Sequence, residues 1–136
     1  MQSGTLIIDI DDFRSYNAAY GLQGGDLCLQ WIGEVLTVVS EQHNALISRL
    51  RGGTFMLKLK NTTSQYSAKL AEEIRQHVLA LQIQRESSGP SGVVTVSVGG
   101  AVQVPDENSN ASELIEKASR ALAQAKSEGK NRAIVV

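Results

Sequence analysis

Three carboxylates lie close together near the start of this 136-residue chain: Asp9, Asp11 and Asp12. They follow a compact apolar run, 5–8, that is typical of a buried strand. Because side chains alternate along a strand, Asp9 and Asp11 point to the same side and can converge on one cation. Such carboxylates can hold Mg²⁺ beside substrate phosphates. The alternative interpretation is an ordinary strand end, in which Asp12 caps the helix that follows.

A second polar pair, Asn17 and Asp26, flanks a glycine-containing stretch over 21–25. Asp26 stands where the N-cap of a long amphipathic helix over 26–41 is predicted, and this role alone would explain it. The same pair could also present an amide and a carboxylate to a ligand. A guanine edge with N–H donors would suit that combination.

Two further stretches could contact an anionic ligand. Arg51-Gly52-Gly53-Thr54-Phe55 lies between two predicted strands, and its geometry alone is explained by a Gly-Gly turn at the tip of a β-hairpin. Near the C-terminus, Lys126 and Lys130 belong to a cationic stretch over 126–132. Cations there complement the dipole at the end of a helix, and they could also bind phosphates.

The elements that must position these residues follow from hydrophobic periodicity. The predicted order is β-α-β-β-α-β-α-β, with Trp31 in the core, a capping box at Asn110 and Glu113, and Gly129 as a helix C-cap. This order predicts an α+β fold with a ferredoxin-like, palm-type β-α-β-β-α-β core and helices packed on a mainly antiparallel sheet. The strands are expected at 5–10, 46–50, 55–60, 93–104 and 133–136, and the helices at 26–41, 66–81 and 114–125.

Composition limits the class of protein. Hydrophobic residues make up 42% and charged residues 20%, which is typical of one globular domain. A net charge of -1 provides no basic field for nucleic acid. The apolar runs are far shorter than the ~20 residues of a membrane span, so no direct membrane contact is expected. Cys28 is the single cysteine and fits a reducing compartment, while His43 and His77 lack partners at metal-ligand spacing.

Taken in order, these features resemble the GGDEF domain, the diguanylate cyclase family, which condenses two GTP molecules into cyclic di-GMP on a palm-like fold. The resemblance spans the chain and rests on 9–14, on Asn17 with 25–26, on 94–99 and on 118–132. It implies a metal site formed by the Asp9 carboxylate and the Ile10 carbonyl. It also implies that Asn17 and Asp26 read guanine, and that the triphosphate is held by Arg14, Lys126 and Lys130. Lys130 replaces a more frequent arginine, which loses the bidentate fork.

The chain departs from the family at the motif that gives it its name. Aligning Phe55 puts Gly53 at the acidic metal-ligand position and Thr54 at the next glutamate. Aligning the two glycines instead deletes both acidic positions. In either register Arg51, Gly52, Gly53, Thr54 and Phe55 supply no carboxylate, so we expect weakened Mg²⁺ binding and no functional catalytic residue there. The product-inhibition motif Arg-x-x-Asp is also missing at 42–45, which predicts no cyclic di-GMP binding at that site.

The resemblance therefore implies a degenerate, catalytically inactive GGDEF domain that regulates or scaffolds cyclic di-GMP signalling and can bind GTP. Two alternatives remain open: an active diguanylate cyclase with a metal site rebuilt from Asp9, Asp11 and Asp12, and a nucleotide-free ferredoxin-like interaction domain. Residues 1–136 are expected to form a single GGDEF-like domain from a larger, cytoplasmic or membrane-anchored protein, lacking the family's usual N-terminal segment. A neighbouring EAL or sensor domain and a second copy are the expected protein partners.

Overall fold

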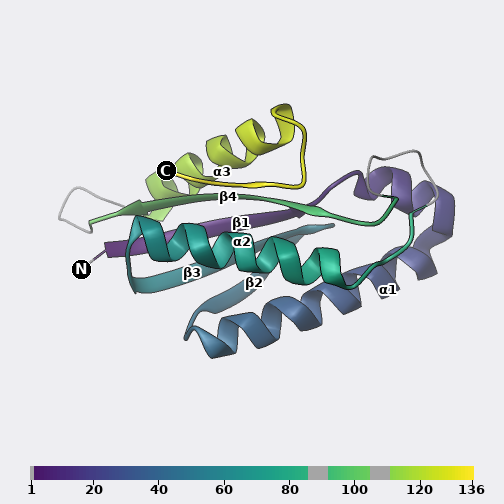
Figure 1. Cartoon of the computed structure of the whole chain (residues 1–136), viewed down its shortest axis with the longest axis horizontal. Helices are drawn as coiled ribbons and strands as arrows, with labels where there is room; N and C mark the ends of the chain where they lie inside the picture. Colours follow the sequence, from purple (N-terminus) through teal and green to yellow (C-terminus); the bar gives the residue numbers. More distant parts are fainter. Residues whose placement is uncertain (1, 86–91, 105–110) are drawn as a thin grey trace.

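The computed structural model describes residues 2–85, 92–104 and 111–136, and its element order is the predicted one (Figure 1). The prediction of an α+β fold with a ferredoxin-like core is confirmed. The predicted capping role of Asn110 lies outside the described residues. In order, the elements are β1 (Gln2–Ile10), α1 (Phe13–Gln42), β2 (Leu46–Arg51), β3 (Thr54–Thr62), α2 (Ser64–Ala80), β4 (Val96–Gln103), α3 (Ala111–Ser127) and β5 (Ala133–Val135).

The five strands form one mixed sheet in the order β2-β3-β1-β4-β5. β1 is central and runs antiparallel to both β3 and β4, whereas the short β5 runs parallel to β4. The central position of β1 places Asp9 between two partners, Thr54 on β3 and Ser97 on β4. The carboxylates at the end of β1 are thereby surrounded by side chains from neighbouring strands.

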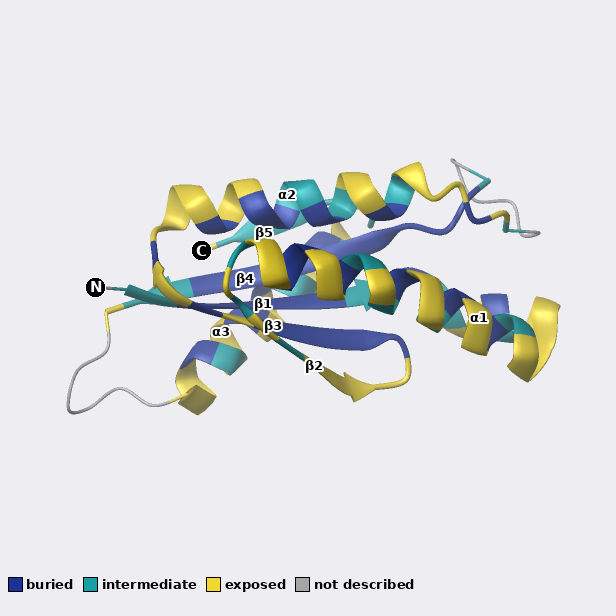
Figure 2. Cartoon of the chain, turned by 90° about the horizontal axis from the view of Figure 1, so that it is seen from below, coloured by how far each residue is buried: buried dark blue, intermediate teal, exposed yellow. Residues whose placement is uncertain are grey.

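Helices cover both faces of the sheet. α1 and α2 cover one face, where they pack on Leu6, Ile8 and Ile10, while α3 packs on the opposite face against Ile7 and Ala101. Figure 2 shows that the buried sides of α1 and α2 face the sheet and that their outer sides are exposed. The alternation of β1 side chains therefore sorts its residues between two separate apolar layers, and the odd-numbered positions lie on the α3 side.

α1 combines the helix expected after Asp12 with the long helix predicted over 26–41. It begins at Phe13, and its two helical segments meet at Gly21, whose backbone is non-helical (φ 76°, ψ 179°). The N-cap prediction for Asp26 is wrong, because Asp26 lies inside the second segment and the boundary residue of α1 is Asp12. Glycine adopts the positive φ without steric cost, which lets the chain change direction between the two segments.

The predicted core position of Trp31 is also wrong: its side chain is 43% exposed, and Leu27 and Val38 on the same stripe are exposed as well. α1 carries two adjacent apolar stripes, and periodicity alone cannot decide which one faces the sheet. The stripe that is buried consists of Cys28, Ile32, Leu36 and Val39.

None of the helices in the described ranges is both long and apolar enough to cross a membrane.

Candidate nucleotide and metal site

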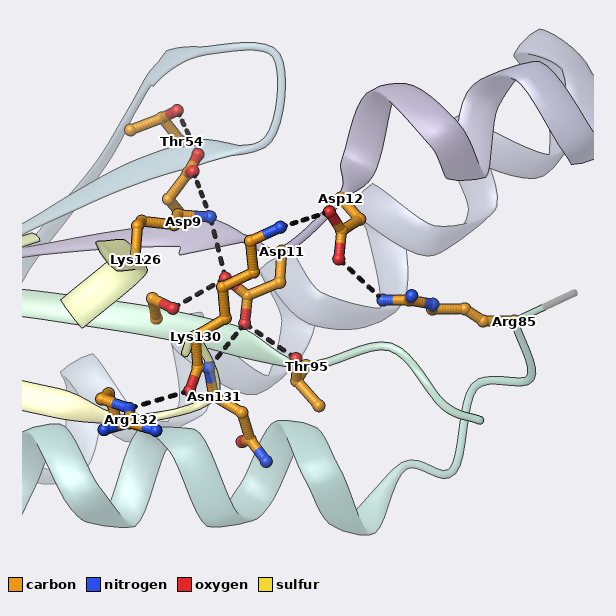
Figure 3. Close-up of polar contacts among 11 residues, drawn as sticks. Asp9, Asp11, Asp12, Thr54, Arg85, Thr95, Lys126, Lys130, Asn131 and Arg132 are labelled. Atoms are coloured by element: carbon orange, nitrogen blue, oxygen red, sulfur yellow. Dashed lines mark hydrogen bonds and ion pairs between the residues drawn. The ribbon is translucent and has the colours of Figure 1, made fainter. Parts of the chain in front are cut away.

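Asp9 and Asp11 converge on one cation, and that cation belongs to the protein itself (Figure 3). Lys126, in the last turn of α3, places its Nζ 2.7 Å from Asp9 Oδ2 and 2.8 Å from Asp11 Oδ1. Strand alternation predicted this convergence. The site is formed because α3 packs on the face of the sheet to which both carboxylates point. Lys126 therefore balances one of the two carboxylate charges of the pair.

The second oxygen of Asp9 is also occupied by a protein group. Thr54, at the start of β3, donates its hydroxyl to Asp9 Oδ1 at 2.7 Å. Gly53 faces the other side of the sheet, since a Cβ added there would lie 3.0 Å from Phe13 Cδ2 and 3.3 Å from Ile10 Cβ. The Ile10 N–H also donates to the Gly53 carbonyl at 3.0 Å, which fixes the hairpin tip to β1. The hairpin residue opposite Asp9 is thus Thr54, whereas Gly53, which the resemblance puts at the acidic metal-ligand position, does not face Asp9.

Asp11 is almost fully buried, with a side chain that is 1% exposed, and all its contacts are strong donors. Besides Lys126, it accepts hydrogen bonds from Thr95 Oγ1 at 2.7 Å, from Ser97 Oγ at 2.7 Å and from the Asn131 N–H at 3.0 Å. Ser97 belongs to β4, Thr95 directly precedes that strand, and Asn131 lies between α3 and β5. Asp11 is therefore a buried hydrogen-bonding centre that joins three parts of the chain.

The electrostatics of Lys126 favour its charged form. Burial on its own lowers the pKa of this ammonium, but the hydrogen bonds and charges of Asp11 and Asp9 outweigh burial, so the pKa is raised above its usual value. A charged ammonium at this position repels Mg²⁺, which requires near-octahedral oxygen ligands. Within the described ranges, no three His, Cys, Asp or Glu side chains are grouped as metal ligands would be. The donor set around Asp9 fits a resident Mg²⁺ poorly.

Asp12 joins two further cations in an ion triad of Asp12, Lys130 and Arg85. Lys130 Nζ lies 2.6 Å from Asp12 Oδ1, and Arg85 Nη1 lies 3.1 Å from Asp12 Oδ2 (Figure 3). The hydrogen bond from Lys130, with a further contribution from Arg85, outweighs burial and lowers the pKa of Asp12. The triad lines a cleft of about 300 Å³ together with Asp11, Thr95, Gly129, Asn131 and Arg132.

The bend in α1 brings Asn17 against Gly25, the residue before Asp26. A Cβ added to Gly25 would lie 1.9 Å from Asn17 Oδ1, so the Asn17 amide lies directly against the backbone beside Asp26. In a straight helix, residues eight apart are separated by about 12 Å along the axis, so the bend at Gly21 is what allows this contact. Asp26 and Arg14 are both exposed and can reach a ligand in solvent.

Several residues of the site escaped the sequence analysis. The resemblance treats Thr54 only as a missing acid and assigns no role to Arg85. Thr95 and Ser97 alternate with valines over 94–98, which places them on one face beside Asp11. The alternation predicts a polar face on this segment, but only the strand order, which makes β4 a neighbour of β1, shows that the face meets Asp11.

The segment that replaces the product-inhibition motif lies at the end of α1. His43 is the C-cap residue; its Nε2 lies 3.2 Å from Glu73 Oε2, and its Nδ1 contacts the Tyr66 hydroxyl. These contacts fasten the end of α1 to α2. The expectation that no cyclic di-GMP binds at 42–45 stays a prediction.

Comparison with known proteins places this geometry among related domains. A family model described as "Diguanylate cyclase, GGDEF domain" matches residues 1–132. Diguanylate cyclase A of Treponema denticola is 32% identical over 127 residues, covering 93% of this chain and 33% of that protein. Diguanylate cyclase DgcM of Escherichia coli K12 is 31% identical over 129 residues, covering 95% of this chain and 30% of that protein. The chain thus spans about a third of the length of these relatives.

Solved structures agree with the sequence comparison. The crystal structure of the GGDEF domain of DgcB from Caulobacter crescentus, in complex with c-di-GMP, has a TM-score of 0.87 at 27% identity, covering 99% of this chain and 76% of that chain. An EAL/GGDEF domain protein from M. capsulatus has a TM-score of 0.72 at 26% identity, covering 98% of this chain and 84% of that chain.

Proposed function

The chain belongs to the diguanylate cyclase GGDEF domain family, and we propose that within this family it is a regulatory, GTP-binding domain of cyclic di-GMP signalling that lacks cyclase activity. One observation carries the proposal. Both oxygens of Asp9, the carboxylate assigned to the metal by resemblance, are held by protein groups, the Thr54 hydroxyl and the Lys126 ammonium. A domain with this arrangement is suited to bind a nucleotide without turning it over.

The chemical cost of this arrangement follows from what the reaction needs. Joining two nucleotides requires positioning and neutralisation of triphosphate charge, which Mg²⁺ normally supplies when it is bound. Thr54 contributes a neutral hydroxyl at the position from which a carboxylate would face Asp9. Losing one electrostatic contributor of this kind lowers a rate by ~10²–10³. The competing ammonium of Lys126 weakens the site further.

The direct test is formation of cyclic di-GMP from GTP, followed chromatographically with Mg²⁺ and separately with Mn²⁺. The chain is assayed alone and as a dimer enforced by a fused leucine zipper, because the reaction joins two nucleotides and needs two domains face to face. We expect no product above the protein-free background in either form. Turnover at ordinary enzyme rates, on the order of 1 s⁻¹ or faster, would overturn the proposal.

A substitution at the hairpin tests the structural reason. Thr54→Asp places a carboxylate opposite Asp9 and should create measurable Mn²⁺ binding in calorimetry, whereas the original chain should show none in the same range. Gly53→Asp is the matched control, because it adds the same charge one residue away but directs it toward Phe13. Equal Mn²⁺ affinity in all three proteins would show that the hairpin residue opposite Asp9 does not limit metal binding.

Guanine selectivity is the second part of the proposal. The contact of Asn17 with Gly25 holds an amide beside the exposed Asp26 carboxylate, and this pair can accept from and donate to a guanine edge. We expect calorimetry to give tighter binding of GTP than of ATP. Asn17→Ala should reduce that preference, while Gln23→Ala, which removes an exposed amide on the same helix, should leave it unchanged. Equal affinities for GTP and ATP would remove guanine reading from the proposal.

The regulatory role concerns domains outside this chain. We propose that a GTP-dependent change in this domain is transmitted to a neighbouring EAL or sensor domain; the chain itself spans about a third of the length of the relatives compared above. The EAL/GGDEF neighbour from M. capsulatus supports that combination. A ligand can bias such a neighbour only through different affinities for its two states. Measuring the neighbour's activity with and without GTP in the full-length protein tests this role.

A further inference from the structure

The ion triad of Asp12, Lys130 and Arg85 has properties that differ from an ordinary surface ion pair. The Arg85 side chain is only 11% exposed, that of Asp12 is 30% exposed and that of Lys130 is 42% exposed. The triad therefore runs from a largely buried guanidinium to an accessible ammonium, with the carboxylate between them. Its three members come from the segment after α2, from the junction of β1 and α1, and from the segment between α3 and β5.

The backbone of Asp12 indicates what its side chain is used for. Asp12 occupies the N-cap position of α1, where a carboxylate would ordinarily accept a hydrogen bond from the first turn. Its side chain makes no such bond, and its backbone is left-handed (φ 55°, ψ 34°). The carboxylate is instead directed at Lys130 and Arg85. A side chain that forgoes capping in an unfavourable conformation is held by the cations it contacts.

A carboxylate between two cations presents the same chemistry as a phosphate oxygen in that place. The cleft beside the triad, about 300 Å³ in volume, is also lined by Thr95, Asn131 and Arg132. We propose that Asp12 is an internal competitor for phosphoanions, whose carboxylate engages Lys130 and Arg85 and must be displaced before a polyphosphate can bind in this cleft. This inference rests on the proposed nucleotide binding and adds the residue that sets its strength.

Removing the charge of Asp12 should therefore strengthen anion binding. Asp12→Asn keeps the shape of the side chain and tolerates a left-handed backbone, and Asp12→Gly tolerates that backbone without cost. Two variants guard against one of them failing to fold, which circular dichroism checks. Glu41→Gln is the matched control, because it removes the same charge from an exposed position at the far end of α1.

The measurement is calorimetric titration with sodium tripolyphosphate, which carries no base, without added metal. Both Asp12 variants should bind it at least about fivefold more tightly than the original chain and Glu41→Gln, the factor that corresponds to about 1 kcal/mol. Adding Lys130→Met to Asp12→Asn should abolish the gain. The inference is overturned if the Asp12 variants match the original chain, or if no protein of the set binds tripolyphosphate.

Parallel titrations with GTP and ATP separate this inference from the proposed function. If tripolyphosphate affinity rises in both Asp12 variants while GTP binds no better than ATP, competition by Asp12 stands and guanine reading fails. If the original chain prefers GTP but neither Asp12 variant gains affinity for any of the three anions, the proposed function stands and the inference is wrong.

Discussion

Asp11 should be the most sensitive polar residue for folding, and Asp11→Asn tests this. The carboxylate is 1% exposed and accepts from Lys126, Thr95, Ser97 and the Asn131 N–H. An amide retains one acceptor oxygen and turns an NH₂ group toward two of these donors. Hydroxyl groups can rotate to accept, but an ammonium and a backbone N–H cannot. One orientation of the amide therefore leaves the Asn131 N–H unpaired, and the other leaves Lys126 with Asp9 as its remaining carboxylate partner.

Leaving a buried donor unsatisfied costs about 1–3 kcal/mol, a substantial part of the roughly 5–15 kcal/mol that holds a domain together. Urea denaturation followed by circular dichroism should show this loss with an unchanged m-value. Glu41→Gln, an exposed charge change, should stay within about 0.5 kcal/mol. A loss below about 1 kcal/mol for Asp11→Asn would refute the view of Asp11 as a buried hydrogen-bonding centre.

A double-mutant cycle tests the origin of that loss. Combining Asp11→Asn with Lys126→Met removes the cation that the first change leaves behind. The losses in unfolding free energy of the two single variants, added together, should then exceed the loss of the double variant by about 0.5–3 kcal/mol, as for residues in one network. Simple additivity would show that Asp11 and Lys126 stabilise the fold independently.

Three further outcomes are expected. Gly99→Ala should lower the free energy of unfolding in urea by about 3 kcal/mol or more, because the added Cβ would lie 2.1 Å from a backbone nitrogen of α3. Gly33→Ala, with open space around the added Cβ, should be neutral or stabilising. The hydrogen bond from Arg75 lowers the pKa of Glu72, so the ionised carboxylate stabilises the fold above pH 4.5, and this contribution is lost as the pH falls through the lowered pKa. In Glu72→Gln, the free energy of unfolding should therefore fall less steeply with acid. Fluorescence of Trp31, the single tryptophan, should be quenched by iodide in the folded protein, and resistance to quenching would contradict its 43% exposure.

Much of the fold could be predicted because local patterns and tertiary packing agree. The alternation in 54–62 and the Gly-Gly turn before it specify a hairpin whatever surrounds them. α1 shows where this agreement ends. Its sequence carries two apolar stripes and a run of glycines, and the packing of the sheet, together with the bend at Gly21, decides which stripe is buried and where the helix begins.

In the candidate site, too, the sequence determines some features and tertiary packing determines others. The sequence determined which charged groups are available: carboxylates at the end of one strand, lysines after one helix, and a hairpin without an acid. Chemistry and spacing alone also placed Asp9 and Asp11 on one side of that strand. The partners of the three carboxylates lie 45 or more residues away: Thr54 beside Asp9, Lys126 beside Asp11 and Lys130 beside Asp12. No local pattern specifies such pairs, because they exist only once strand order and helix packing bring distant segments together. Tertiary structure alone therefore decided that a protein ammonium stands between these carboxylates.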